Sequence, residues 1–75
     1  MYGVKVTKND KVDIYRINDT INTVRITTAL VIDSIMKELR KMEDWTILEE
    51  TDTKYHAKGV FTGFDFVVEI VEMGA

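Results

Sequence analysis

The residues that could carry out catalysis are few and scattered along the chain. There is no cysteine, and the single serine, Ser34, lies in a stretch with helical spacing rather than on the sharp turn that exposes a serine nucleophile. The single histidine, His56, is expected to face Glu69 across two antiparallel strands, which is more typical of a solvated cross-strand contact than of a general base. The sequence therefore predicts no catalytic residue and a protein that is not an enzyme.

Three carboxylates near a predicted turn have the oxygen ligands that Ca²⁺ or Mg²⁺ requires: Glu49, Glu50 and Asp52. Because neighbours in a strand point to opposite faces, Glu49 and Glu50 cannot both reach one ion unless the strand contains a bulge. The four glycines are scattered, so none belongs to a glycine-rich loop that would hold phosphate. We expect neither a metal site nor a cofactor.

Charge is unevenly divided along the chain, although the formal net charge is only -3. Residues 1–41 carry eight basic and five acidic side chains, whereas residues 42–75 carry two basic and eight acidic ones. If this division persists in the fold, the carboxyl-terminal half forms an acidic surface that attracts a basic partner. The candidate partner-binding residues are Glu49, Glu50, Asp52, Asp65 and Glu69.

Binding of nucleic acid is the alternative that the amino-terminal half suggests. It would use the basic residues Lys5, Lys8, Lys11, Arg16 and Arg25. The chain as a whole is not basic, and no exposed aromatic set at stacking spacing accompanies these residues. Nucleic acid is therefore the less favoured partner.

The clearest predicted element is an amphipathic helix over residues 28–43. Its charged residues lie on one side, and its apolar residues recur at three- and four-residue spacing: Leu30, Ile32, Ile35, Met36, Leu39 and Met42. Thr27 or Thr28 can cap its start. A helix of this kind packs its apolar side against another element.

Three strands are predicted after the helix, over residues 45–51, 54–61 and 64–73. A two-residue turn at Thr62-Gly63 would set Phe61 opposite Phe64, Gly59 opposite Phe66 and His56 opposite Glu69. One face of the sheet is then almost wholly apolar, and we expect its aromatic residues to form the core beneath the helix: Trp45, Tyr55, Phe61, Phe64 and Phe66.

Two registers compete for the hairpin at residues 51–53. A two-residue turn at Asp52-Thr53 would place Trp45 and Ile47 in water, because a slip of one residue turns every side chain over. A three-residue loop from Thr51 to Thr53 instead sets Trp45 opposite Gly59 and Ile47 opposite Ala57. It also brings Glu50 to Lys54 on the solvent side, and we adopt this register.

Before the helix, residues 2–8 and 11–17 are predicted to form a hairpin about Asn9-Asp10, with Val4 opposite Tyr15 and Tyr2 opposite Ile17. The β-branched residues of segment 20–27 favour a third strand. A helix from Asp19 to Glu43 remains the alternative, because a second set of residues also falls at helical spacing: Ile21, Val24, Thr28, Val31 and Ile35.

These elements predict a single domain over residues 1–75 of the α+β class, with one amphipathic helix on an antiparallel sheet in the order βββ-α-βββ. So short a chain gains burial by sharing apolar surface, so we expect a homodimer. No apolar run is long enough for a membrane span, and the amino terminus lacks the apolar core of a secretion signal. We expect a cytoplasmic protein.

In its size, its acidity, its lysine- and isoleucine-rich composition and its lack of catalytic signals, the chain resembles the small host-takeover proteins of phages of Gram-positive bacteria. This resemblance is one of type and rests on no motif. It implies a protein that binds and inhibits a host enzyme, in some cases by presenting carboxylates in place of DNA phosphates to a basic groove of a replication or transcription protein. A housekeeping adaptor subunit is the other function that we consider.

Overall fold

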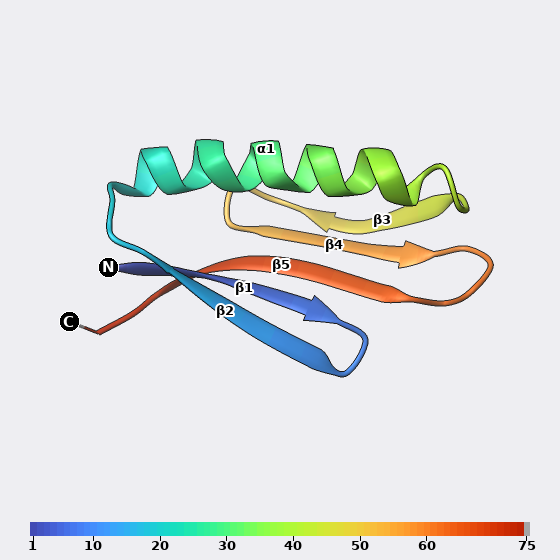
Figure 1. Ribbon diagram of the computed structural model, residues 1–75, viewed down its shortest axis with the longest axis horizontal. Helices are drawn as coiled ribbons and strands as arrows, with labels where there is room; N and C mark the ends of the chain where they lie inside the picture. The colour runs from blue at the N-terminus through green and yellow to red at the C-terminus, as the bar shows by residue number, and fades with distance from the viewer. Residues whose placement is uncertain (75) are drawn as a thin grey trace.

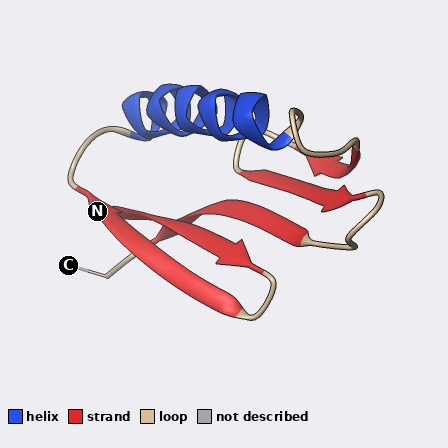
Figure 2. Cartoon of the chain, turned by 45° about the vertical axis from the view of Figure 1, so that its right-hand side comes forward, coloured by secondary structure: helices blue, strands red, loops and turns tan. Residues whose placement is uncertain are grey.

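The chain folds as a β-hairpin, one helix and three further strands. The structure, a computed structural model, describes residues 1–74. Its elements are β1 (Tyr2–Lys8), β2 (Lys11–Ile17), α1 (Ile21–Leu39), β3 (Trp45–Glu50), β4 (Lys54–Gly59) and β5 (Asp65–Glu72). The strands form one antiparallel sheet in the order β2-β1-β5-β4-β3, with α1 along one face (Figure 1, Figure 2). The predicted α+β class is confirmed, and β2 and β3 are the edges of the sheet.

Helix α1 begins at Ile21, so the prediction of a strand over residues 20–27 is wrong and the order is ββ-α-βββ. Thr20 caps the helix, because its Oγ1 accepts a hydrogen bond from the backbone N–H of Thr23 at 3.3 Å. The β-branched residues of this segment favour a strand only weakly. That preference is outweighed because helical spacing buries Val24 and Thr28 on the same side as Met36.

The helix ends at Leu39 rather than at Glu43. Residues 40–43 turn the chain toward β3, and the indole N–H of Trp45 donates to the carbonyl oxygen of Leu39 at 3.1 Å. Trp45 also packs edge-on against Phe64, with ring centroids 6.1 Å apart. These contacts fix the direction in which the chain enters β3.

The core lies between α1 and the face of the sheet that the helix covers. Its buried members come from the helix and from the three inner strands: Val4, Val6, Val24, Met36, Tyr55, Ala57, Phe66 and Val68. Phe66 is 1% exposed and lies on β5, the central strand of the sheet. Four of the five aromatic residues expected in the core are buried or half-buried, whereas Phe61 is 91% exposed.

Phe61 is exposed because the register of β4 and β5 differs from the predicted one by two residues. Ala57 pairs with Phe66 and Lys54 with Glu69, so residues 60–63 form the loop in place of the predicted two-residue turn. Gly63 adopts a φ of +73° there, a conformation that glycine allows without strain. A shift of two residues leaves every strand side chain on its predicted face, so the apolar face survives although its pairings change.

The β3–β4 hairpin contains both of the registers that competed for it. Trp45 pairs with Gly59 and Ile47 with Ala57, as predicted, but a bulge follows between Ile47 and Glu49. Beyond the bulge Glu49 pairs with His56, and Thr51 N donates to Lys54 O at 2.8 Å across Asp52 and Thr53. Glu49, and not Glu50, therefore lies beside Lys54.

The β1–β2 hairpin has the predicted register, with Val4 opposite Tyr15 and Tyr2 opposite Ile17. Its turn residue Asn9 has a φ of 54°, which asparagine tolerates better than most residues. Asn9 also holds the start of β5, because its N–H donates to Asp65 O at 2.8 Å and its Oδ1 accepts from Asp65 N at 2.9 Å. Within residues 1–74, no helix has both the length and the apolar composition that crossing a membrane requires.

Candidate functional site

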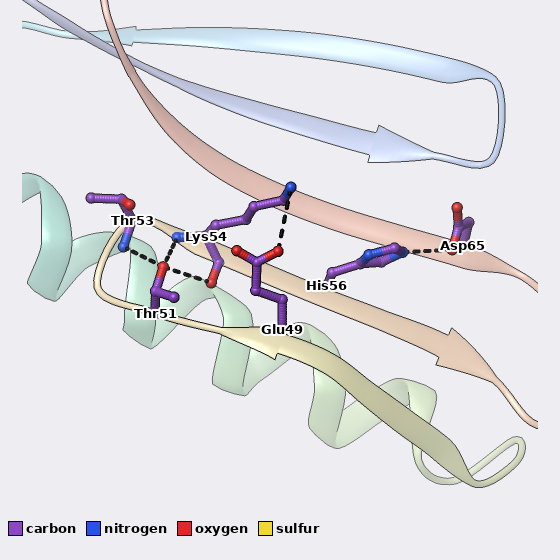
Figure 3. A network of polar contacts seen from close by, with 6 residues as sticks. All are labelled: Glu49, Thr51, Thr53, Lys54, His56 and Asp65. Atoms are coloured by element: carbon purple, nitrogen blue, oxygen red, sulfur yellow. Dashed lines mark hydrogen bonds and ion pairs between the residues drawn. The ribbon is translucent and has the colours of Figure 1, made fainter.

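Three of the five predicted partner-binding acids lie on the face of the sheet that α1 leaves uncovered. Glu49 and Asp65 reach this open face from β3 and β5 (Figure 3), and the register of β5 places Glu69 on the same face. Glu50, one residue beyond Glu49, belongs to the other face, where it pairs with Tyr55, and Asp52 lies in the exposed β3–β4 turn. The structure therefore brings three of the predicted residues onto one face and separates the other two.

The three acids of the open face are interleaved with basic side chains. Glu69 pairs with Lys5 on one side and with Lys54 on the other. The Nζ atom of Lys54 lies 3.5 Å from Glu49 Oε1, as Figure 3 shows. Because β1 of the basic half pairs with β5 of the acidic half, the open face carries charges of both signs and is not an acidic surface.

The remaining acid, Asp65, lies beside the only histidine. Its Oδ1 is 2.8 Å from His56 Nε2 (Figure 3), and Lys58 is its partner across the strands. His56 was expected to face Glu69, but the two-residue shift of the register places Val67 opposite it. Within residues 1–74 no group of three or more histidine, cysteine, aspartate or glutamate side chains is arranged to hold a metal ion.

The basic residues that would bind nucleic acid are also dispersed. Lys5 and Arg16 lie on the open face, whereas Lys8 and Lys11 flank the β1–β2 turn. Arg25 lies on α1 and lines a groove of about 180 Å³ with residues of the β3–β4 turn. These residues do not form one basic surface.

A group of hydrogen bonds holds the loop between β4 and β5, and the Glu43 carboxylate lies at its centre. This residue belongs to the loop between α1 and β3. One carboxylate oxygen, Oε1, accepts from the backbone N–H groups of Phe61 at 2.9 Å and Thr62 at 3.0 Å. The other, Oε2, accepts from the Thr62 hydroxyl at 2.7 Å. The hydrogen bonds from Thr62, first that of its backbone and then that of its hydroxyl, lower the pKa of Glu43 below its usual value.

Backbone hydrogen bonds complete the constraint on this loop. Gly63 N donates to Gly59 O at 3.0 Å, Gly59 N to Phe64 O at 2.9 Å and Val60 N to Asp44 O at 2.9 Å. Gly59 leaves space for the Glu43 side chain, because a Cβ atom there would lie 2.7 Å from Glu43 Oε1. The loop therefore has a defined conformation that joins β4, β5 and the α1–β3 loop.

This loop presents an aromatic side chain to solvent. Phe61 is 91% exposed, and Val60 beside it and Met42 of the α1–β3 loop are exposed as well. The two loops lie at the same end of the molecule, away from both chain termini (Figure 1). We call Met42, Val60 and Phe61 the apolar tip.

Single apolar residues are common on protein surfaces. What distinguishes Phe61 is that a charged side chain and several backbone hydrogen bonds hold its loop in place without burying it. Sequence reasoning missed this residue because the predicted two-residue turn placed Phe61 in the core. The signal that could have found it is Glu43, an acidic residue beyond the helix, but nothing local connects it to a loop 18 residues away.

No family model, curated protein or solved structure matches this chain. The apolar tip is the candidate functional site on its geometry alone.

Proposed function

We propose that the protein is a non-enzymatic binding module that inserts Phe61 into an apolar pocket of a partner protein. The observation that carries this proposal is the 91% exposure of Phe61 on a loop held by three hydrogen bonds to the Glu43 carboxylate. Aromatic side chains that fill a pocket on a partner are typical binding hot spots.

The energetics favour this use of the loop. Transfer of an exposed phenylalanine side chain from water into an apolar pocket contributes about 1.5–3 kcal/mol. A flexible loop would lose part of this on binding, because ordering a mobile side chain and its backbone costs free energy. The hydrogen bonds of Glu43 and of the backbone order the loop in advance, so less of the binding energy is lost.

Inhibition of a host enzyme, which the sequence resemblance implies, is one function that such a module can serve. The apolar tip supports binding to a protein pocket rather than to a basic groove that normally receives DNA. For a DNA-like surface, the acids of the open face would have to outnumber the bases around them. Instead Glu49, Asp65 and Glu69 share that face with Lys5, Lys54 and Lys58. We therefore do not favour the acidic surface as the binding site.

The test is affinity capture of partners with the wild-type protein and with Phe61→Ala. The lysate is that of a Gram-positive bacterium, the kind of host that the resemblance implies. Ile26→Ala is the control, because Ile26 is also an exposed apolar residue and lies on α1 rather than in the apolar tip. We expect a partner that the wild type and Ile26→Ala retain and Phe61→Ala loses. The affinity of Phe61→Ala for this partner should be lower by about 10- to 160-fold, for a loss of about 1.5–3 kcal/mol.

A second variant tests whether binding depends on the ordered conformation of the loop as well as on the Phe61 side chain. Gly59→Ala keeps Phe61 but places a Cβ atom where the Glu43 carboxylate lies. We expect this variant to bind more weakly than the wild type although its aromatic anchor is present. Equal retention of the partner by the wild type and Phe61→Ala, with both proteins folded, would contradict the proposed function.

A further inference from the structure

The outer edge of β2 carries unpaired backbone hydrogen-bonding groups. Asn9 N donates to Asp65 O, so the odd-numbered residues of β1 bond to β5 and its even-numbered residues bond to β2. The partners of those even-numbered residues are Lys11, Asp13, Tyr15 and Ile17. The N–H and C=O groups of Val12, Ile14 and Arg16 therefore point away from the sheet.

β2 carries apolar side chains on both faces, although Lys11, Asp13 and Arg16 are charged. Val12 and Ile14 lie on the open face, and Ile14 is 52% exposed. On the helix side Tyr15 is 56% exposed and, with Ile17, borders an apolar groove of about 270 Å³. The groove is completed by residues of β1 and α1, among them Val31 and Ile35.

We propose that β2 pairs with β2 of a second copy of this chain, antiparallel and about a twofold axis at Ile14. Ile14 then lies opposite Ile14 of the second copy, and Val12 lies opposite Arg16 at both ends. Each of these pairs exchanges two backbone hydrogen bonds, because all three residues point outward. The axis is perpendicular to the sheet, so both helices lie on the same face of one continuous sheet.

Charge and the length of the pairing select this register over its neighbours. With the axis at Ile14, Asp13 faces Tyr15 and Lys11 faces Ile17, so no like charges lie directly opposite one another. Moving the axis to Asp13 would place two Asp13 carboxylates face to face, and moving it to Tyr15 would shorten the pairing.

The groove favours a second copy as the occupant over an unrelated strand. In this register Tyr15 of each copy lies diagonally across the shared edge from Tyr15 of the other, within reach of an aromatic side chain, so the two apolar grooves approach one another at this residue. A chain of 75 residues buries only a limited core, and association through this edge supplies further apolar burial. This dimer is independent of the apolar tip, because Phe61 takes no part in it.

The twofold register is tested by complementary charges at one position. Ile14→Lys and Ile14→Glu each place like charges face to face across the axis, and the exposed position lets the monomer tolerate them. In sedimentation equilibrium at high micromolar concentration, we expect the wild type at twice the 8.7 kDa of the chain and each variant alone as a monomer. An equimolar mixture of the two variants should recover the dimer. Leu48→Lys, which charges an exposed residue of the other edge, is the matched control and should remain dimeric.

A disulfide cross-link tests the register of the dimer without relying on a variant that weakens dimer affinity. The chain has no cysteine, so Ile14→Cys can form a disulfide only between two copies. The Cα atoms of a hydrogen-bonded antiparallel pair lie about 5.5 Å apart, within the range that a disulfide spans. We expect mild oxidation to cross-link Ile14→Cys and to leave Val12→Cys, whose partner is Arg16, largely monomeric. A monomeric wild type, a dimeric Ile14→Lys, or a mixture that stays monomeric would each overturn the proposal.

Discussion

The two edges of the sheet, β2 and β3, meet the solvent in different ways. β2 pairs with β1 at every residue from Lys11 to Ile17 without interruption. β3 has a bulge between Ile47 and Glu49 and carries two successive carboxylates, Glu49 and Glu50. Bulges and charges are the means by which natural sheets keep an edge from pairing with another strand. β2 has charged residues too, Lys11, Asp13 and Arg16, but it has no bulge, so the bulge is what makes β3 the better protected edge.

The surfaces beside the two edges differ in the same sense. The groove between α1 and β2 is apolar, and Tyr15, Ile17 and Val31 lie along it. The groove on the other side of the helix is bordered by polar residues of the β3–β4 turn, including Asp52 and Lys54. One helix cannot cover a five-stranded sheet, and the groove beside β2 is more apolar than the groove on the β3 side. This difference is a reason for proposing association at β2 rather than at β3.

The largest expected effect on stability comes from a substitution in β5, the central strand between the two edges of the sheet. Phe66 lies on the central strand β5 and is 1% exposed. We expect Phe66→Ala to lower the free energy of unfolding by about 3–5 kcal/mol, the usual cost of truncating a buried aromatic residue. Chemical denaturation measures it, with Phe61→Ala as a control that should change stability by less than about 0.5 kcal/mol. A loss below about 1 kcal/mol for Phe66→Ala would show that this residue is not in the core.

The next effect on stability distinguishes the backbone N–H groups of β2 that bond to β1 from those that point outward. Asp13→Pro removes an N–H group that bonds to β1, so it should destabilise the monomer by roughly 1–3 kcal/mol. Ile14→Pro removes an N–H group that points outward, so it should cost the monomer less than about 1 kcal/mol. Both are measured by urea denaturation at low protein concentration, where association does not contribute. Equal losses for the two variants would contradict the assigned hydrogen-bond pattern and with it the difference between the edges.

The sequence predicts those parts of the fold that local spacing and burial determine. The pairings Val4 with Tyr15 and Trp45 with Gly59 follow because a one-residue slip would expose an apolar face. Burial cannot exclude a two-residue slip, which keeps every side chain on its face, and this is the error made for β4 and β5. The start of α1 was misassigned for another reason: propensity favoured a strand at residues 20–27, whereas tertiary burial of Val24 and Thr28 favours the helix.

The candidate site was less predictable than the fold because it depends on contacts between distant residues. The loop that exposes Phe61 is held by Glu43, and neither residue carries a local signal of this contact. The acids that sequence reasoning selected were chosen by charge along the chain. The pairing of β1 with β5 sets Lys5 beside Glu69, so the asymmetry does not persist on this face of the sheet. Charge patterns in a sequence survive in a fold only when the sheet order keeps the two halves apart.

A smaller effect distinguishes the loop between β4 and β5, which hydrogen bonds to the Glu43 carboxylate hold in place, from the β1–β2 hairpin. Hydrogen bonds lower the pKa of Glu43, so its contribution to stability is present above the unfolded pKa and is lost as pH falls through the folded pKa. We expect acid to release the loop at residues 60–63 at pH values below the usual glutamate pKa of about 4.3. The amide signal of Thr62 in NMR should shift with this titration, whereas that of Val4 should not. Glu43→Gln should abolish the transition, and a Thr62 signal that still titrates in this variant would refute the assignment to Glu43.

The smallest effect concerns the charges that mark β3 as a terminal edge. Glu49 contacts Lys54 at 3.5 Å, but both side chains are more than a third exposed, so solvent screens the pair. We expect Glu49→Ala to change the free energy of unfolding by no more than about 0.5 kcal/mol, and high salt to remove most of that difference.

If these carboxylates serve to keep β3 unpaired rather than to stabilise it, their removal should instead show as association. Glu49→Ala combined with Glu50→Ala, placed in the Ile14→Lys background that blocks the β2 edge, isolates this effect. Sedimentation should then detect weak self-association that Ile14→Lys alone lacks, whereas a strictly monomeric triple variant would leave the bulge as the only device that protects β3.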